Sequence, residues 1–439
     1  MKSRFLAVLG SAVLVLAGCS SGTSVTQAPG ASAAPSAAAA GTQPSAAVTG
    51  DVTVWSWRIE DKDAYKKMFD AFTAKNPGIN VTFETTVDTE YETKLTTALR
   101  AGKGPDIAQL KAYGELQPLT DAGYLVALDD KIAGLKDFFP AALDGARSVT
   151  DKKVYGVPYA MPDMGVFYNK KIFADNGISV PQTYDEFVAA CQKLKAAGII
   201  PIAAGGASGT AWALEIMIGV VGPNIYGANT FWNDIESGKA TFTDPRYVAA
   251  LKRLQDLYPY YSPGMEGVDY TTATQQFING KAAMFMGGSW ENGSFKSQNK
   301  DLQFDIFSFP PDKAGDAAYT SSFADGSYGL VSASKNQDAA VKVLEYMTSL
   351  EWAQAYADLL GWPAGRPGVT ANDPVLQSML KMQANQTPYL SLVGFRWHTP
   401  TASEIIQADI ANVMAGKMTP EALAQKIQDG VSTWFKPTP

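Results

Sequence analysis

Apolar positions beyond residue 50 recur with two periods, every second residue in some segments and every third or fourth in others. Residues 79–85 alternate and residues 52–55 form a short β-branched run, so both segments predict strands. Between them, residues 61–74 carry large apolar side chains at helical spacing, and Asn76-Pro77-Gly78 then ends the predicted helix. The folded part of the chain therefore begins as strand, helix, strand.

The same two patterns continue to the end of the chain. Further strands are predicted at 106–110, 166–168, 199–204, 282–286 and 304–308. Further helices are predicted at 90–101, 185–197, 244–258, 272–279, 337–348, 373–384, 403–415 and 420–428. Strands that alternate with helices predict an α/β fold, with mainly parallel sheets covered by helices on both faces.

Length and composition narrow the possible functions. Residues 51–439 exceed the roughly 250–300 residues at which a single core stops growing, so two domains are expected. The chain is acidic, with 36 basic and 43 acidic side chains, and it has no long run of Lys and Arg, which argues against nucleic-acid binding. His398 is the only histidine, which excludes a multi-histidine metal cage, and neither a metal nor a cofactor is expected.

The first fifty residues predict export and tethering. Residues 1–18 combine a basic start, an apolar run and small residues, which is typical of a secretory signal. The ending Leu16-Ala17-Gly18-Cys19 resembles the lipobox of bacterial lipoproteins, which implies lipidation of Cys19; an ordinary secreted protein with an unrelated cysteine is the alternative. Residues 19–50 have no charge and no aromatic side chain, and they predict a disordered tether. Cys191, then without a disulfide partner, is predicted as a buried apolar group on the helix 185–197.

Large aromatic side chains with polar neighbours recur where the predicted strands end, and ligands of α/β sheets bind at the carboxyl ends of strands. Tryptophan beside a carboxylate or a guanidinium suits a sugar, because the ring covers the C–H face of a pyranose while polar groups take its hydroxyls. We predict Trp55, Trp352 and Trp434 in the core, Trp232 in a surface loop of undecided role, and Trp362 undecided. The glycine-rich segment 205–209 predicts a turn, with phosphate binding as a weaker alternative because the usual spacing is missing. The candidate ligand-binding residues are Trp57, Arg58, Glu60, Gln109, Lys111, Tyr113, Asp163, Trp212, Trp290, Glu291, Asp325, Arg396, Trp397 and His398.

Several short motifs occur in a specific order between residues 51 and 439. They are Val54-Trp55-Ser56-Trp57, Lys75-Asn76-Pro77-Gly78-Ile79, Gly102-Lys103-Gly104-Pro105-Asp106, Asp121-Ala122-Gly123, Tyr155-Gly156-Val157-Pro158-Tyr159, Phe167-Tyr168-Asn169-Lys170, 181–187, 280–284, Gly288-Ser289-Trp290 and 339–361. In this order the chain resembles the extracellular solute-binding proteins of family 1, the carbohydrate receptors of ABC importers that include maltose-binding protein.

The resemblance implies a two-lobed fold of the periplasmic-binding-protein type, with the sugar held between lobes that close on it. Carried over by position, lobe one comprises 51–158 plus 325–370 and lobe two 159–324 plus 371–439. The family's binding groups match the loops of Trp57 to Glu60 and Gln109 to Tyr113, and its stacking aromatics match Trp212, Trp290 and Trp397. The first two loops depart from the carboxylate-rich pattern of the maltose receptor, which favours another oligosaccharide.

The resulting prediction is a lipid-anchored, monomeric receptor on the extracytoplasmic face of the membrane that delivers an oligosaccharide to a permease and has no catalytic activity. Two alternatives remain. One is an exported carbohydrate-active enzyme that uses carboxyl groups such as Glu291 and Asp325. The other keeps the fold and changes the ligand to a peptide, a polyamine or a metal ion.

Overall fold

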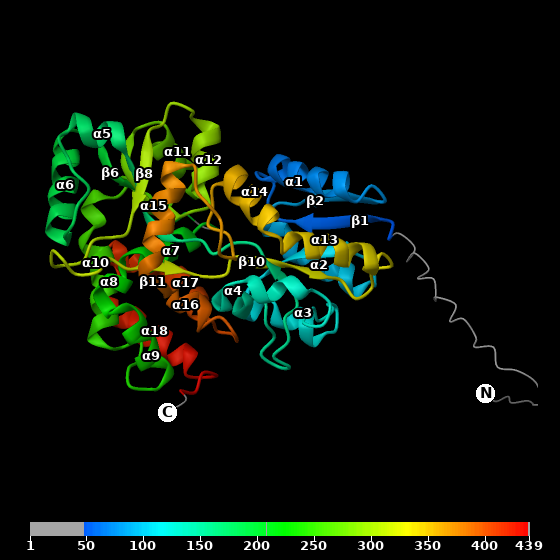
Figure 1. Cartoon of the computed structure of the whole chain (residues 1–439). Helices are drawn as coiled ribbons and strands as arrows, with labels where there is room; N and C mark the ends of the chain where they lie inside the picture. The colour runs from blue at the N-terminus through cyan, green and yellow to red at the C-terminus, as the bar shows by residue number, and fades with distance from the viewer. Residues whose placement is uncertain (1–47, 208, 438–439) are drawn as a thin grey trace, which may run out of the picture. The chain divides into compact units, whose positions relative to one another are not determined.

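The computed structural model describes residues 48–207 and 209–437, and Figure 1 shows the order of its elements along the chain. The predicted signal, the lipidation site Cys19 and nearly all of the predicted tether lie outside the described residues. Among the helices that are described, none has the length and apolar character needed to cross a membrane.

The first sheet has the strand order β2-β1-β3-β10-β4. Its strands are β1 (Gly50–Ser56), β2 (Ile79–Thr85), β3 (Ile107–Lys111), β4 (Val157–Pro158) and β10 (Gly326–Leu330). β1 pairs in parallel with both β2 and β3, whereas β10 runs antiparallel to β3 and β4. The helices that precede β4, or that follow β10, are α1 (Lys62–Lys75), α2 (Asp88–Arg100), α3 (Gln117–Asp121), α4 (Pro140–Gly145), α13 (Gln337–Met347) and α14 (Leu350–Leu360). The carboxyl ends of β1 and β3 therefore lie side by side, which places the loops after Ser56 and Lys111 at one edge.

The second sheet has the order β6-β7-β5-β8. Its strands are β5 (Met164–Asn169), β6 (Ile200–Ala203), β7 (Ala282–Gly288) and β8 (Phe304–Phe307). Only β6 and β7 pair in parallel, so the prediction of mainly parallel sheets is wrong for this sheet, while the α/β fold class is confirmed. Periodicity could not show this, because a strand buried on both faces carries the same apolar run in either direction.

Helices of very different length accompany the second sheet. They are α5 (Lys170–Asp175), α6 (Tyr184–Ala196), α7 (Trp212–Val221), α8 (Pro223–Tyr226), α9 (Ala228–Glu236), α10 (Pro245–Asp256), α11 (Tyr270–Ile278), α12 (Glu291–Gln298), α15 (Pro374–Met382), α16 (Leu390–Val393), α17 (Ala402–Met414) and α18 (Pro420–Val431). Helix α7 was not predicted, because it is buried from Ala213 to Val221 and so shows no amphipathic period. Trp232, predicted in a surface loop, lies on α9.

The chain passes between the two sheets three times. It leaves β4 at Pro158 and enters β5 at Met164, and it returns from β9 (Thr320–Ser322) to β10 at Gly326. Beyond Trp362, an isolated bridge joins Ala160 to Ala364 before α15 packs against β8. Strand β9 of the second crossing pairs with β11 (Gln386–Pro388), which lies beyond α15, and an isolated bridge joins Ser322 of β9 to Asp163 of the first crossing.

Helix α7 is joined to the C-terminal helices by a buried carboxylate, Glu215, which is 4% exposed. Its Oε1 accepts hydrogen bonds from Ser391 Oγ at 2.8 Å and from Ser403 Oγ at 2.6 Å, and its Oε2 accepts from Gln407 Nε2 at 2.7 Å. Because buried carboxylates are costly unless hydrogen-bonded, these donors fix α7 against α16 and α17.

The burial of four tryptophans differs in part from the prediction. Trp352 and Trp362 are buried, at 2% and 1% exposure, which confirms Trp352 as core and settles Trp362. Trp55 and Trp434 are only half-buried, so their prediction as core residues is wrong. Trp55 stands on the face of β1 that α2 covers incompletely, a gap that strand propensity cannot reveal. Cys191 is fully buried on α6 as predicted, and burial raises the pKa of its thiol.

Candidate functional site

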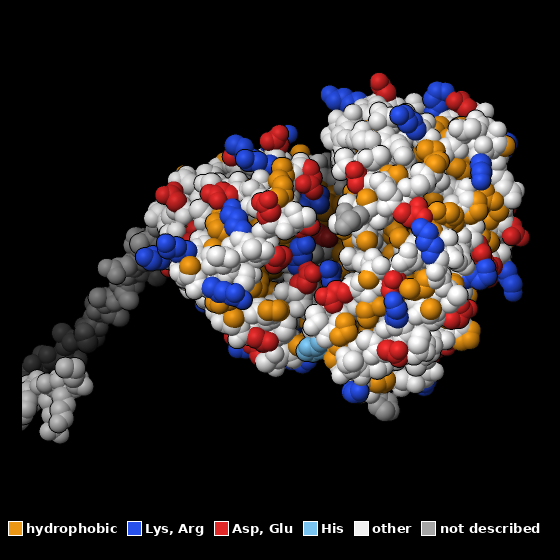
Figure 2. Space-filling view, turned by 180° about the vertical axis from the view of Figure 1, so that it is seen from behind, with side chains coloured by type: hydrophobic (Ala, Val, Ile, Leu, Met, Phe, Trp, Pro, Cys, Tyr) orange, Lys and Arg blue, Asp and Glu red, His pale blue; other side chains and the backbone are white. Residues whose placement is uncertain are grey.

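Acidic and basic side chains gather along the walls of a groove that is visible in the space-filling view (Figure 2). On the side of the first sheet, Arg58 follows β1 and its side chain is 13% exposed. Its Nε lies 2.6 Å from Asp61 Oδ2 and its Nη1 lies 2.9 Å from Glu60 Oε1. The guanidinium also lies over the ring of Trp362, 4.7 Å from its centroid. Burial opposes the charge of Arg58, but these carboxylates outweigh burial and raise its pKa.

Asp325, on the return crossing before β10, belongs to the same group. Its Oδ2 accepts a hydrogen bond of 2.6 Å from the hydroxyl of Tyr159. Burial raises the pKa of Asp325, while Tyr159 and Arg58 act in the opposite direction. Two of the three crossings between the sheets therefore meet at a carboxyl group that also interacts electrostatically with Arg58.

On the side of the second sheet, three aromatic rings surround one carboxyl group. Trp212, at the first turn of α7, is 36% exposed and packs on Tyr270, with the ring centroids 4.5 Å apart. The indole Nε1 of Trp290 donates to the hydroxyl of Tyr270 at 3.0 Å, and that hydroxyl donates to Glu291 Oε1. These contacts form a connected group of Trp212, Tyr270, Trp290 and Glu291, which we call the aromatic–carboxyl group.

Local structure explains the position of each member of this group. Asp269 caps α11 by accepting from Thr272 N at 2.6 Å, which places Tyr270 at the first helical position. Strand β7 ends in glycines, and a Cβ at Gly288 would lie 2.0 Å from the ring of Trp290. Only glycine lets the indole lie over the strand end, and Glu291 then begins α12.

The aromatic–carboxyl group interacts electrostatically with the charged residues Arg58 and Glu60 that follow β1. Glu291 is 5% exposed, and its pKa is raised to about 7, because burial and, to a smaller extent, Glu60 outweigh the lowering effects of the Tyr270 hydrogen bond and of Arg58. The positive charge of Arg58 also acts to lower the pKa of Tyr270. The ring of Trp290 packs against the hydrophobic cores of both sheets. The structure thus brings together six candidates, which are Arg58, Glu60, Trp212, Trp290, Glu291 and Asp325.

A second set of contacts joins the segment after β3 to the segment before α17. Arg396 Nη2 lies 2.8 Å from Glu115 Oε1, and the rings of Tyr113 and Trp397 meet edge to face with centroids 6.0 Å apart. Tyr113 adopts φ 60° and its hydroxyl accepts from Ala324 N at 2.9 Å. A Cβ at Gly114 would lie 1.9 Å from the carbonyl oxygen of Arg396, so the two backbones touch there.

Lys111 lies beside this second set of contacts. Its Nζ is 2.8 Å from Asp88 Oδ1 and 5.4 Å from the centroid of the Trp57 ring. Glu92 has its pKa raised to about 7 by burial, with Lys111 and Arg396 acting to lower it and with Glu115 and Asp88 acting to raise it. Charges of both signs therefore converge on this edge of the groove.

Two further candidates are buried polar groups with an unpartnered atom. Gln109 Oε1 accepts from Ser56 Oγ at 2.5 Å and from Trp57 N at 3.3 Å, and its Nε2 has no partner among the described residues. Asp163 Oδ1 accepts from Gln386 Nε2 at 2.6 Å, whereas its Oδ2 has no partner in the described part of the chain. Burial raises the pKa of Asp163 to about 8.

Not every candidate is open to a ligand in this conformation. Tyr113 is 3% exposed, and its ring is covered by its contact with Trp397. His398 is exposed and packs on Trp434, with centroids 5.5 Å apart. Trp397 donates from Nε1 to the carbonyl of Val393 at 3.1 Å and is half-buried.

Sequence reasoning missed Tyr270, Tyr159 and Glu115. Tyr270 directly follows a helix-capping aspartate in Asp269-Tyr270-Thr271-Thr272, which was a usable signal for an aromatic at a helix start. Tyr159 and Glu115 gave no such signal, because each has its role only through a partner more than 160 residues away, Asp325 and Arg396 respectively.

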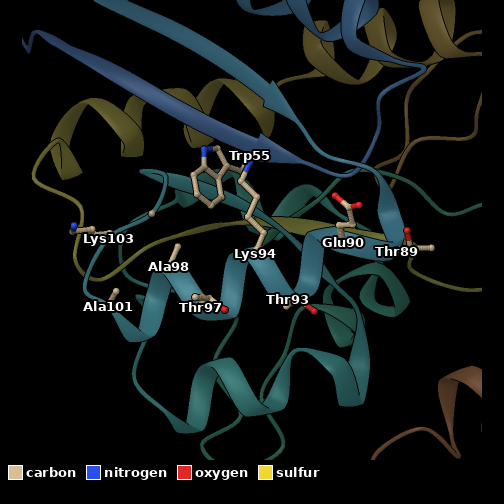
Figure 3. Close-up of a pocket in the computed structure, with 10 residues that line it drawn as sticks. Trp55, Thr89, Glu90, Thr93, Lys94, Thr97, Ala98, Ala101 and Lys103 are labelled. Atoms are coloured by element: carbon tan, nitrogen blue, oxygen red, sulfur yellow. The ribbon is translucent and has the colours of Figure 1, made fainter.

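A separate hollow lies beside Trp55, between β1 and α2 (Figure 3). Its volume is about 730 Å³, and Thr93, Lys94 and Ala98 of α2 line it together with Trp55. Lys94 Nζ lies 4.3 Å from the centroid of the Trp55 ring. None of the candidate ligand-binding residues lines this hollow, so it is distinct from the groove.

Comparison with known proteins agrees with this geometry. The profile of the family described as bacterial extracellular solute-binding protein matches residues 56–354, which is more than half of the chain. The chain belongs to this family.

Relatives of this solute-binding protein cover most of its length. The multiple sugar-binding protein of Streptococcus mutans serotype c (strain ATCC 700610 / UA159) is 27% identical over 85% of the chain and 86% of that relative. The maltotriose-binding protein of Pyrococcus abyssi (strain GE5 / Orsay) is 26% identical over 80% of the chain and 74% of the relative.

Solved structures show the same two-lobed architecture. A chitin oligosaccharide binding protein superposes with a TM-score of 0.72 at 27% identity, over 87% of this chain and 98% of that one. RafE, a solute-binding protein solved in complex with raffinose, superposes with a TM-score of 0.72 at 22% identity, over 88% of this chain and 99% of that one, and supports the fold. The two-lobed fold predicted from the resemblance is confirmed, and the family places the protein outside the cytoplasm.

Proposed function

We propose that this solute-binding protein captures an oligosaccharide between its lobes and delivers it to the permease of an ABC importer. The observation that carries the proposal is that the aromatic–carboxyl group of the second sheet interacts electrostatically with Arg58 and Glu60 of the first sheet, beside Asp325 on a crossing. Aromatic faces with planar polar groups match the C–H faces and hydroxyls of a pyranose. The sugar-binding relatives support the same ligand class.

Capture follows from the division of the binding groups between two lobes. We assign 51–158 plus 325–370 to lobe one and 159–324 plus 371–439 to lobe two, a division that the membership of the two sheets supports. A ligand drives closure only through contacts that it gains in the closed form, so platforms on both lobes are required. Periplasmic binding proteins close around their ligands by hinge motion, and hinges fall where a few residues absorb the backbone change. The three crossings meet that description.

Lipidation of Cys19 would hold the receptor at the extracytoplasmic face of the membrane, while 19–50 would act as a tether. With an average reach of roughly 30 Å, estimated from the random-coil scaling of flexible linkers, the tether would let a single receptor molecule meet a permease beside its own anchor. We propose that the protein works as a monomer in this role.

Calorimetric titration against a panel of oligosaccharides tests the proposal, with the same mixtures analysed by chromatography for shortened products. Binding with no change in the sugars supports a transport receptor. Shortened sugars produced at catalytic rates would instead favour the alternative of a carbohydrate-active enzyme that uses Glu291 and Asp325 as paired carboxyls. If peptides or polyamines bind and no sugar does, the ligand class is wrong.

A further inference from the structure

Glu291 has an unused acceptor inside the aromatic–carboxyl group. The residue is 5% exposed, and its Oε1 accepts from the hydroxyl of Tyr270. Trp290 also acts on this carboxyl as a hydrogen-bond donor and lowers its pKa. No direct hydrogen bond to Oε2 is found among the described residues, and Oε2 is not one of the fully covered atoms that lack a partner, so it keeps some exposed surface. A carboxylate oxygen that is mostly buried and unpaired favours a ligand that brings a hydrogen-bond donor.

Among the described residues, the basic side chain that acts on the Glu291 carboxylate already forms ion pairs with other carboxylates. Arg58 is the basic side chain that acts on Glu291, and it is held by Asp61 and Glu60. Four carboxyl groups of the described residues, Glu60, Asp61, Glu291 and Asp325, interact electrostatically with this one guanidinium. Burial raises the pKa of Glu291 and of Asp325, so the groove has an excess of negative charge when these two carboxyls are ionised, and a bound cation would favour that ionised form.

Aromatic faces next to a carboxylate form a site for a cation as well as for a pyranose. The ring of Tyr270 packs on Trp212, and its hydroxyl accepts a hydrogen bond from Trp290 and donates one to Glu291. Ring faces attract an ammonium group electrostatically, and a charge-assisted hydrogen bond to the carboxylate is stronger than a neutral one. A sugar that carries a protonated amine would satisfy the rings and the open oxygen of Glu291 together.

We propose that the groove selects basic amino sugars, in particular oligosaccharides with glucosamine-type units, over N-acetylated, neutral and acidic sugars. This inference rests on the proposed function, because it names the ligand class of the same site. Glu291 Oε2 accepts the ammonium hydrogen bond, while Trp212 and Tyr270 cover the sugar ring.

Competition calorimetry tests the inference with glucosamine oligomers, N-acetylglucosamine oligomers of equal length, maltotriose and a galacturonic acid oligomer. We expect the glucosamine oligomer to bind about tenfold or more tightly than its N-acetylated counterpart, and the galacturonic acid oligomer to bind weakest. In Glu291→Gln the preference should fall to about twofold or less, since a neutral amide cannot form the charged contact. Glu90→Gln, a carboxyl replacement at the separate hollow beside Trp55, should retain the full preference.

The possible outcomes separate the inference from the function on which it rests. If neutral sugars bind and glucosamine oligomers bind no better, the inference is wrong and the proposed function stands. If neither these sugars nor any other oligosaccharide of the panel binds, the proposed function fails. If Glu291→Gln does not fold, the salt dependence of the wild-type protein decides, because an amine preference that does not weaken with added salt contradicts the charge mechanism.

Discussion

The guanidinium of Arg58 lies over the indole of Trp362, 4.7 Å from the ring centroid, although the two residues are far apart in the sequence. Trp362 is 1% exposed, so it forms a rigid base for Arg58, which Asp61 and Glu60 hold from the sides. A cation fixed by an aromatic face and two carboxylates cannot easily turn toward another partner. This arrangement keeps Arg58 from pairing directly with Glu291 on the opposite side of the groove.

Arg58→Met should destabilise the protein by about 2–3 kcal/mol, because it leaves the 11%-exposed carboxylate of Asp61 without its partner. The double variant Arg58→Met with Asp61→Leu should regain at least half of that loss, since removing both charges also removes the unpaired one. Urea unfolding followed by tryptophan fluorescence measures both changes. Lys66→Met is the matched control, because its pair with Asp70 is exposed and should matter by less than about 1 kcal/mol. Strictly additive losses in the double variant would contradict the pairing.

Trp290→Ala should weaken oligosaccharide binding by about 10-fold to 100-fold, as expected for a central aromatic anchor. The indole packs against both cores and orients Tyr270 through a 3.0 Å hydrogen bond, so its removal disturbs both sides of the groove. Isothermal titration measures the affinity. Trp55→Ala is the matched tryptophan control, because Trp55 lines the separate hollow in Figure 3 and should leave the affinity unchanged. The opposite pattern, with Trp55 and not Trp290 required, would move the binding site to the hollow.

Gly114→Ala should separate the segment after β3 from the segment 394–398. The new methyl group would lie 1.9 Å from the carbonyl oxygen of Arg396, and backbone cannot yield as a flexible side chain can. We expect loss of the Arg396–Glu115 ion pair, a larger radius of gyration in small-angle scattering without sugar, and about tenfold weaker sugar binding. Gly267→Ala adds a methyl group where nothing lies within 4 Å, and it serves as the control. Identical scattering curves for the two variants would show that this contact does not set the relation between the lobes.

Asp163→Asn should change how stability depends on pH. Burial raises the pKa of Asp163 to about 8 from 3.8, so the folded protein holds a proton that the unfolded chain releases between these values. Stability from this group is therefore fully present below about pH 4 and is lost as the pH rises toward 8, with a slope of up to about 1.4 kcal/mol per pH unit. Thermal unfolding across pH 4 to 9 should show a flatter profile for Asp163→Asn than for the wild type. Asn can still accept the hydrogen bond from Gln386, so a profile of unchanged slope would mean that Asp163 does not carry the proton.

Most regular elements were predictable from the sequence because their apolar period is local. Strand β2 begins and ends where alternation begins and ends, and α1 differs from its prediction by one residue at each end. The elements that were missed lack such a period. Helix α7 is apolar on every side, and α12 begins among glycines and polar residues that resemble a loop.

The sequence predicted which types of side chain form the candidate site, but it did not predict which of these residues contact each other. Residue types and strand ends are both visible along the chain, so the sequence was enough to show that aromatic and charged side chains follow several strands. The contacts of Tyr270 with Trp212 and Glu291, the support of Arg58 by Trp362 and the covering of Tyr113 by Trp397 appear only in the folded protein. The physical reason is that charge pairing and ring packing act across space between residues up to about 300 positions apart, whereas the period of a segment reflects only its own neighbours.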